Sequence, residues 1–127
     1  MYANGVYHLR VITVAETTPF QRKAATLLST EERDDLIAYV SEHPSTGDLI
    51  QGTGGIRKIR WARGNKGKSG GVRVIYYYHS EIMPLYLLAI FGKNEKANVS
   101  AEEKHLLSSM VKELVAYWRS RNEQGIH

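Results

Sequence analysis

The sequence predicts an α+β fold: a small twisted sheet of about four strands, mostly antiparallel, with two N-terminal helices and one C-terminal helix. Short runs of β-branched and aromatic residues are typical of strands. Two segments open with helix-capping motifs, and the last three strand-like runs follow one another too closely for parallel crossovers. Because 127 residues is close to the commonest domain size, we expect residues 1–127 to form one domain with the order β-α-α-β-β-β-α.

The first strand and the first helix are expected near the N-terminus. Residues 7–14 are rich in β-branched side chains and short enough for a strand, and residues 16–19 indicate a break after it. Residues 19–28 suit a helix, because Pro19 stands in its first turn and apolar residues recur at helical spacing.

A capping box marks the start of the second helix. Ser29 and Glu32 have the spacing at which a hydroxyl and a carboxylate each bind the other residue's backbone amide. His43 precedes Pro44 and should end this helix, since a residue before proline disfavours helical angles. The glycine-rich residues 45–55 follow as an ordered loop, either a plain connector or a backbone segment that approaches a ligand closely.

The C-terminal half predicts an antiparallel meander and a long helix. Short connections join the strand-like runs, which are residues 56–62, 72–78 and 85–91. The two later runs are apolar on both faces and should be central and covered. A second capping box, at Ser100 and Glu103, opens a helix whose apolar residues continue at helical spacing to about Arg121.

The composition is that of a soluble globular protein, with 43% hydrophobic and 24% charged residues. The absence of cysteine excludes a disulfide scaffold, a thiol nucleophile and any cysteine-based metal site. No apolar run is long enough to span a bilayer, and the polar N-terminus lacks the pattern of a signal peptide. We therefore expect a cytoplasmic protein with no membrane partner.

The positive charge is concentrated in one stretch. The net charge is +4, and residues 57–73 hold seven of the 17 basic residues and no acidic one. In the rest of the chain, 13 acidic residues outnumber 10 basic ones. This distribution is typical of a binding site for a polyanion on an otherwise ordinary surface.

Several familiar kinds of site are not supported. Residues 62–69 nearly match a phosphate-binding loop, but such a loop leads into a helix, and here a strand follows. The five histidines are scattered without metal-ligand spacing, and no serine, histidine and aspartate suggest a triad. We expect neither a metal nor a cofactor.

The alternation of a strand collects cations on one face. Lys58 and Arg60 should lie about 7 Å apart on the face opposite the core, with Trp61 on the other face. Arg73 and Tyr77 lie on one face of the next strand. They join Lys58 and Arg60 if that face is on the same side of the sheet. A solvated basic face without a role is the plain alternative; interleaved aromatic residues favour nucleic acid, because they can stack on bases while cations hold phosphates.

Three sequence blocks occur in a distinctive order and spacing. They are GTGGIRKIR at 52–60, KGKSGGVRVIYY at 66–77 and YLLAIFGKNE at 86–95. Together they resemble the RelE/HigB-type toxins of bacterial type II toxin–antitoxin systems, in the HigB-like branch of the RelE/ParE superfamily. The resemblance covers roughly residues 24–118, and the helix-helix-sheet-helix pattern agrees with the RelE-like fold.

The resemblance implies a ribosome-dependent mRNA endoribonuclease. Such toxins cleave a codon in the ribosomal A site: the 2′-hydroxyl attacks the neighbouring phosphate and leaves a 2′,3′-cyclic phosphate. The family's basic positions correspond to Lys58, Arg60 and Arg73, and Lys93 lies next to a position often occupied by arginine. That position is Asn94 here, and the tyrosine that some members carry after this block is missing.

The chemistry assigns a role to each implied residue. Cleavage needs a base, stabilisation of a pentacoordinate phosphate and an acid for the leaving 5′-oxygen. Clustered cations disfavour a protonated lysine, so Lys58 is the expected base, whereas Arg60 and Arg73 stay protonated and hold the phosphate. Lys93 or Lys68 is the expected acid or electrostatic helper. The expected RNA- or ribosome-binding residues are Arg57, Arg63, Lys66, Lys68, Trp61 and Tyr77.

Two other functions remain open at this point. A ParE-like inhibitor of DNA gyrase shares the fold without cutting RNA, and a passive RNA-binding module binds RNA and leaves it intact. The expected partners of the toxin are a cognate antitoxin of the helix-turn-helix HigA type, mRNA and the ribosome. Operator DNA is expected to be contacted only through the antitoxin.

Overall fold

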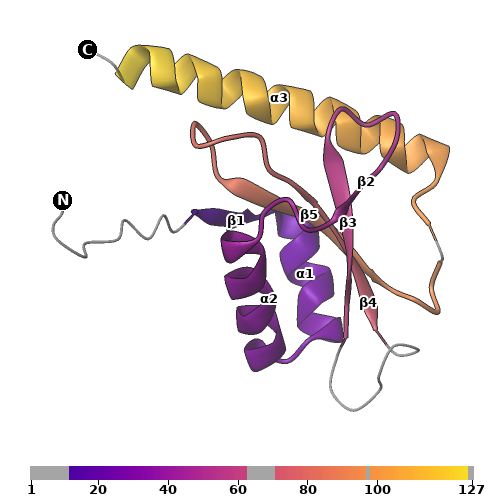
Figure 1. The fold of residues 1–127 in the computed structure, drawn as a ribbon. Helices are drawn as coiled ribbons and strands as arrows, with labels where there is room; N and C mark the ends of the chain where they lie inside the picture. Colours follow the sequence, from indigo (N-terminus) through magenta and orange to yellow (C-terminus); the bar gives the residue numbers. More distant parts are fainter. Residues whose placement is uncertain (1–11, 63–70, 97, 126–127) are drawn as a thin grey trace, which may run out of the picture.

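The computed structural model describes residues 12–62, 71–96 and 98–125 as a five-stranded sheet with helices on both faces (Figure 1). The strand order is β1-β5-β4-β3-β2; β1 is parallel to β5, and the other neighbours are antiparallel. The elements in chain order are β1 (Val14–Glu16), α1 (Thr18–Leu27), α2 (Thr30–Glu42), β2 (Asp48–Leu49), β3 (Ile56–Trp61), β4 (Val72–Tyr77), β5 (Leu85–Gly92) and α3 (Ala101–Gly125).

The α+β class and the predicted order are confirmed, with two corrections. The first strand was expected at residues 7–14, of which the structure describes 12–14; β1 instead runs from Val14 to Glu16, because it pairs with Leu85 to Leu87 of β5. The segment 45–55 also contains the additional strand β2, which pairs with β3. Two residues are too few to show a strand pattern in the sequence.

The helices begin where the capping motifs predicted. The Ser29 hydroxyl accepts a hydrogen bond from the Glu32 amide at 3.1 Å, and the Ser29 amide donates to the Glu32 carboxylate at 2.8 Å. The same reciprocal pair joins Ser100 and Glu103 at the start of α3. Both boxes satisfy amides that a helix cannot bond internally.

Two hydrophobic cores form, one on each face of the sheet. Figure 1 shows α1 and α2 on one side of the sheet and α3 along the other. The first core joins α1 and α2 to alternate residues of β4 and β5, including Phe20, Leu36 and Tyr76. The second lies under α3 and includes Ile75 and Leu88. Every residue of β4 is buried, as expected for a strand covered on both faces.

The second core corrects one expectation about the cations. Lys58 and Arg60 were expected on a face opposite a single core, but that face carries its own core beneath α3. Lys58 is therefore only partly exposed, whereas Arg60, nearer the end of β3, is exposed. Lys58 and Arg60 lie on the part of this face that has no apolar contacts with α3.

A buried tyrosine ties the loop after α2 to the sheet. The hydroxyl of Tyr76 donates to the Pro44 carbonyl at 2.9 Å and accepts from the Gly47 amide at 2.9 Å. A side chain at position 47 would have its Cβ 2.9 Å from that hydroxyl, so glycine is required there. Arg57 adds hydrogen bonds to the carbonyls of Ser45 and Gly47. These contacts hold the loop against the sheet.

Replacing Tyr76 by phenylalanine should destabilise the fold without changing its architecture. The change leaves the Gly47 amide and the Pro44 carbonyl without this partner, and an unsatisfied buried group costs about 1–3 kcal/mol. Denaturant unfolding measures the difference. Tyr117→Phe removes a hydroxyl from a side chain that is 52% exposed and is the control; equal unfolding midpoints for the two variants would contradict the role of Tyr76.

Candidate active site

Two arginines face each other across neighbouring strands. Arg60 of β3 and Arg73 of β4 are direct partners in the antiparallel register, and Arg73 is opposite Phe91 of β5. Directly opposed residues share a face of the sheet, so both guanidinium groups lie on the α3 side together with Lys58. The expectation that Arg73 joins Lys58 and Arg60 is confirmed.

Arg73 is a buried cation with one guanidinium nitrogen that has no partner among the described residues. Its side chain belongs to a residue that is 8% exposed, and its Nη1 has no hydrogen-bond partner among the described residues. Burial lowers the pKa of this guanidinium from its ordinary value, and the charge of Arg60 lowers it further. Buried charges are normally paired. A buried guanidinium with an unsatisfied nitrogen is a candidate anion-binding group.

Lys58 lies between the arginines and the start of α3. Its Nζ donates to Oδ1 of Asn98 at 3.2 Å. Lys58 and Arg60 alternate on the same face of β3, which separates them by about 7 Å along the strand. Asn98 is 40 positions from Lys58 in the sequence, so spacing along the chain does not reveal this contact.

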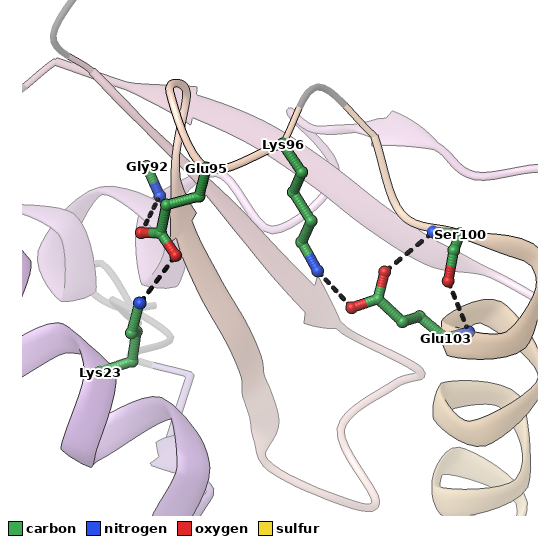
Figure 2. A network of polar contacts seen from close by, with 6 residues as sticks. All are labelled: Lys23, Gly92, Glu95, Lys96, Ser100 and Glu103. Carbon is green, nitrogen blue, oxygen red and sulfur yellow. Dashed lines mark hydrogen bonds and ion pairs between the residues drawn. The ribbon is translucent and has the colours of Figure 1, made fainter.

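Polar contacts fix the segment between β5 and α3 (Figure 2). Glu95 accepts from the Gly92 amide at 3.0 Å and pairs with Lys23 of α1 at 2.7 Å. Glu103 pairs with Lys96 and accepts from the Ser100 amide. The segment is therefore held at one end to α1 and at the other to the first turn of α3.

Lys96 is a site cation that the sequence analysis missed. Its Nζ lies 4.8 Å from the centroid of the Phe91 ring, and Phe91 is the cross-strand neighbour of Arg73. The only available signal was its position three residues after Lys93, directly after the block at 86–95 that carries the resemblance. Lys93 itself is exposed, and its amide donates to the Gly71 carbonyl at 3.2 Å, next to the start of β4.

Three residues that were expected to contact RNA instead contact other parts of the protein. Tyr77 is 6% exposed and packs in the core under α3, so its ring offers no free stacking surface. Trp61 lies on the opposite face, with its ring centroid 5.3 Å from that of Tyr39. Arg57 donates to the loop carbonyls of Ser45 and Gly47. The expected contacts of the β3–β4 loop lie outside the described residues: Arg63, Lys66 and Lys68.

The described residues contain neither a membrane-spanning helix nor a cluster of metal-binding side chains. None of the helices there is long and apolar enough to cross a membrane. Within the same ranges, no group of three or more histidine, aspartate or glutamate side chains is placed to hold a metal ion.

Arg73→Met should leave the fold at least as stable as the wild type. The substitution removes a buried unpaired charge and keeps an apolar side chain of similar length, and such replacements of buried ionic groups are neutral or stabilising by about 1–4 kcal/mol. Thermal unfolding at low salt measures the effect. A large loss of stability would show that the guanidinium is a structural element rather than an anion site.

The ion pairs of Glu95 and Glu103 should make stability depend on acid pH. Hydrogen bonds from Lys23 and from Lys96, respectively, lower the pKa of these carboxyls below the ordinary 4.5. Their contribution is therefore complete above pH 4.5 and is lost as the pH falls through the lowered values.

The variant Glu95→Gln/Glu103→Gln tests this dependence. Its melting temperature should be lower than that of the wild type at neutral pH, and the two curves should converge below pH 4.5. Glu113→Gln, at an exposed carboxylate farther along α3, is the control. Parallel curves for the wild type and the double variant would rule out the contribution of these pairs.

Comparison with known protein families identifies the family of the chain. Residues 12–125 match the family model described as the RelE toxin of the RelE/RelB toxin–antitoxin system. The match includes all the described helices and strands and every described residue of the cationic site. A match of this extent implies a cognate antitoxin as partner. The chain belongs to the RelE toxin family and is the toxin of a toxin–antitoxin system.

Proposed function

We propose that this toxin is an mRNA endoribonuclease that cuts a codon in the ribosomal A site and so stops translation. The observation that carries the proposal is the buried guanidinium of Arg73, with an unpartnered Nη1 and with Arg60 as its cross-strand neighbour. RNA supplies the missing counter-charge, because every linkage of its backbone carries an anionic phosphate.

The two arginines suit the charge that develops during cleavage. When the 2′-oxygen attacks the phosphorus, negative charge grows on the phosphate oxygens of the pentacoordinate transition state. Groups that are fixed in position before the reaction stabilise such charge most effectively. Arg73 is fixed by burial in the central strand, and Arg60 is exposed beside it, so Arg60 is the first of the two that an RNA phosphate reaches.

Proton transfer is assigned to lysines. In its neutral form, Nζ of Lys58 takes the proton of the 2′-hydroxyl as the new P–O2′ bond forms. Lys93 gives a proton to the 5′-oxygen as the P–O5′ bond breaks. The products are a 2′,3′-cyclic phosphate and a 5′-hydroxyl end, and no net proton is consumed. The arginines keep their protons throughout and act through charge.

The exposure of the site cations supports the proposal that cleavage depends on the ribosome. Arg60 and Lys93 are exposed at the end of the sheet, on opposite sides of the buried Arg73. A codon bound in the A site is already held in place, which removes much of the entropic cost of aligning a flexible RNA strand. Cleavage of free RNA should therefore be much slower than cleavage of translated RNA.

Primer extension on a reporter mRNA tests the proposal. The wild-type toxin should produce cuts in register with codons on a translated message and none on a copy without a start codon. Arg73→Met should reduce the cleavage rate by at least about 100-fold, the effect of removing one stabiliser of transition-state charge. Arg22→Ala, at an exposed arginine of α1 on the other face, should cut like the wild type.

Other results would point elsewhere. Growth arrest without cuts, together with inhibited DNA supercoiling, would identify a gyrase inhibitor and contradict the nuclease. RNA binding without cuts or growth arrest would identify a passive binding module. Equal cutting by the wild type and Arg73→Met would overturn the role of Arg73.

A further inference from the structure

The turn after β5 carries Lys93, the residue to which proton transfer to the 5′-oxygen is assigned. The Glu95 amide donates to the Gly92 carbonyl at 3.0 Å, which closes a tight turn with Lys93 and Asn94 at its corner. The Lys93 amide donates to the Gly71 carbonyl at 3.2 Å, so the antiparallel ladder of β4 and β5 continues one residue beyond Gly92. The turn is therefore joined to the sheet at the backbone of Lys93.

This ladder fixes where Lys93 lies relative to the arginines. Alternation places Lys93 on the same face of the sheet as Phe91, about 7 Å further along the strand. Phe91 is the cross-strand partner of Arg73, and Arg60 is its partner on the other side. Attacking and leaving oxygens lie in line on opposite sides of the phosphorus. An acid on the β5 side of Arg73 therefore suits a base on the β3 side, which is Lys58.

The Glu95 carboxylate closes the same turn through its side chain (Figure 2). Its Oε1 accepts from the Gly92 amide at 3.0 Å, and its Oε2 pairs with Nζ of Lys23 in α1 at 2.7 Å. Glycine at position 92 leaves room for this contact, because a Cβ there would lie 2.9 Å from Oδ1 of Asn94 and 3.3 Å from Oε1 of Glu95. One carboxylate thus joins the end of β5 and its turn to a helix of the neighbouring layer.

We propose that Glu95 is a positioning residue for Lys93: its two oxygens hold the turn in place, and the turn keeps the ammonium group of Lys93 within reach of the leaving 5′-oxygen. The inference rests on the nuclease function proposed above. A lysine side chain is flexible, so the position of its backbone decides how often its Nζ meets the oxygen, and small misplacements of a catalytic group cost much of its effect. Glu95 acts through Lys93 and touches neither the RNA nor the reacting atoms.

A leaving group that needs no acid separates this role from a structural one. The test uses a short RNA with sulfur in place of the bridging 5′-oxygen at the mapped cut. Its P–S bond breaks to give a thiolate, which forms readily near neutral pH. Cleavage of the sulfur RNA and of the ordinary oxygen RNA is measured in single turnovers on purified ribosomes with saturating toxin.

Glu95→Ala should slow cleavage of the oxygen RNA about 10-fold, which is part of the 10²–10⁴-fold that an acid supplies. It should cut the sulfur RNA at close to the wild-type rate. Glu113→Ala makes the same chemical change at an exposed position of α3 and should cut both RNAs like the wild type. Equal slowing of both RNAs by Glu95→Ala, or no slowing of either, would overturn the positioning role.

A double-mutant cycle tests whether Glu95 acts through Lys93. Lys93→Ala should slow only the oxygen RNA, and adding Glu95→Ala to it should cause no further loss, because effects that pass through one group are not additive. Losses that multiply would show that Glu95 acts independently and would contradict the proposal.

Two further results separate this inference from the nuclease. If the wild type cuts neither RNA on the ribosome, the proposed function fails and the positioning role fails with it. If Glu95→Ala does not fold, Lys23→Gln decides, because it releases the carboxylate from α1 and keeps the hydrogen bond to Gly92. It should slow only the oxygen RNA, about threefold, the effect of losing one exposed ion pair; equal rates of Lys23→Gln and the wild type on that RNA would overturn the proposal.

Discussion

The buried charge of Arg73 is the constraint on which the site depends. A guanidinium in the central strand, without a carboxylate partner among the described residues, is unfavourable in the free protein. The fold tolerates it because two hydrophobic cores stabilise the same strand from both sides. For the proposed nuclease the gain is preorganisation: the charge is fixed before a phosphate binds, so little reorganisation remains for the reaction.

The remaining elements place other groups around this charge. The antiparallel register sets Arg60 beside Arg73 and Phe91 on its other side, and Phe91 carries Lys96 above its ring. Glu95 and Glu103 hold the ends of the segment between β5 and α3, as Figure 2 shows. These carboxylates pair with Lys23 and Lys96, and within the part of the chain that the structure describes neither of them pairs with Arg60 or Arg73.

Local signals predicted most of the fold, and long-range contacts account for what they missed. Capping boxes located the starts of α2 and α3, and strand alternation placed Lys58, Arg60 and Arg73 on one face. The strand β1 was misplaced because its position depends on pairing with β5. Tyr77 was expected at the RNA surface because alternation predicts which face of the sheet it is on. Alternation does not predict that α3 covers that face. The contacts of Lys58 with Asn98 and of Lys96 with Phe91 likewise depend on how α3 packs.

Nitrogen-15 NMR of the arginine side chains tests most directly whether Arg73 binds the phosphate. The titrant is a short RNA with a 2′-deoxy nucleotide at the cleavage position, which cannot react. The Nε–H signal of Arg73 should shift as the RNA saturates the toxin, while that of the distant Arg22 should stay in place. Saturable binding that leaves the Arg73 signal unmoved would contradict the account.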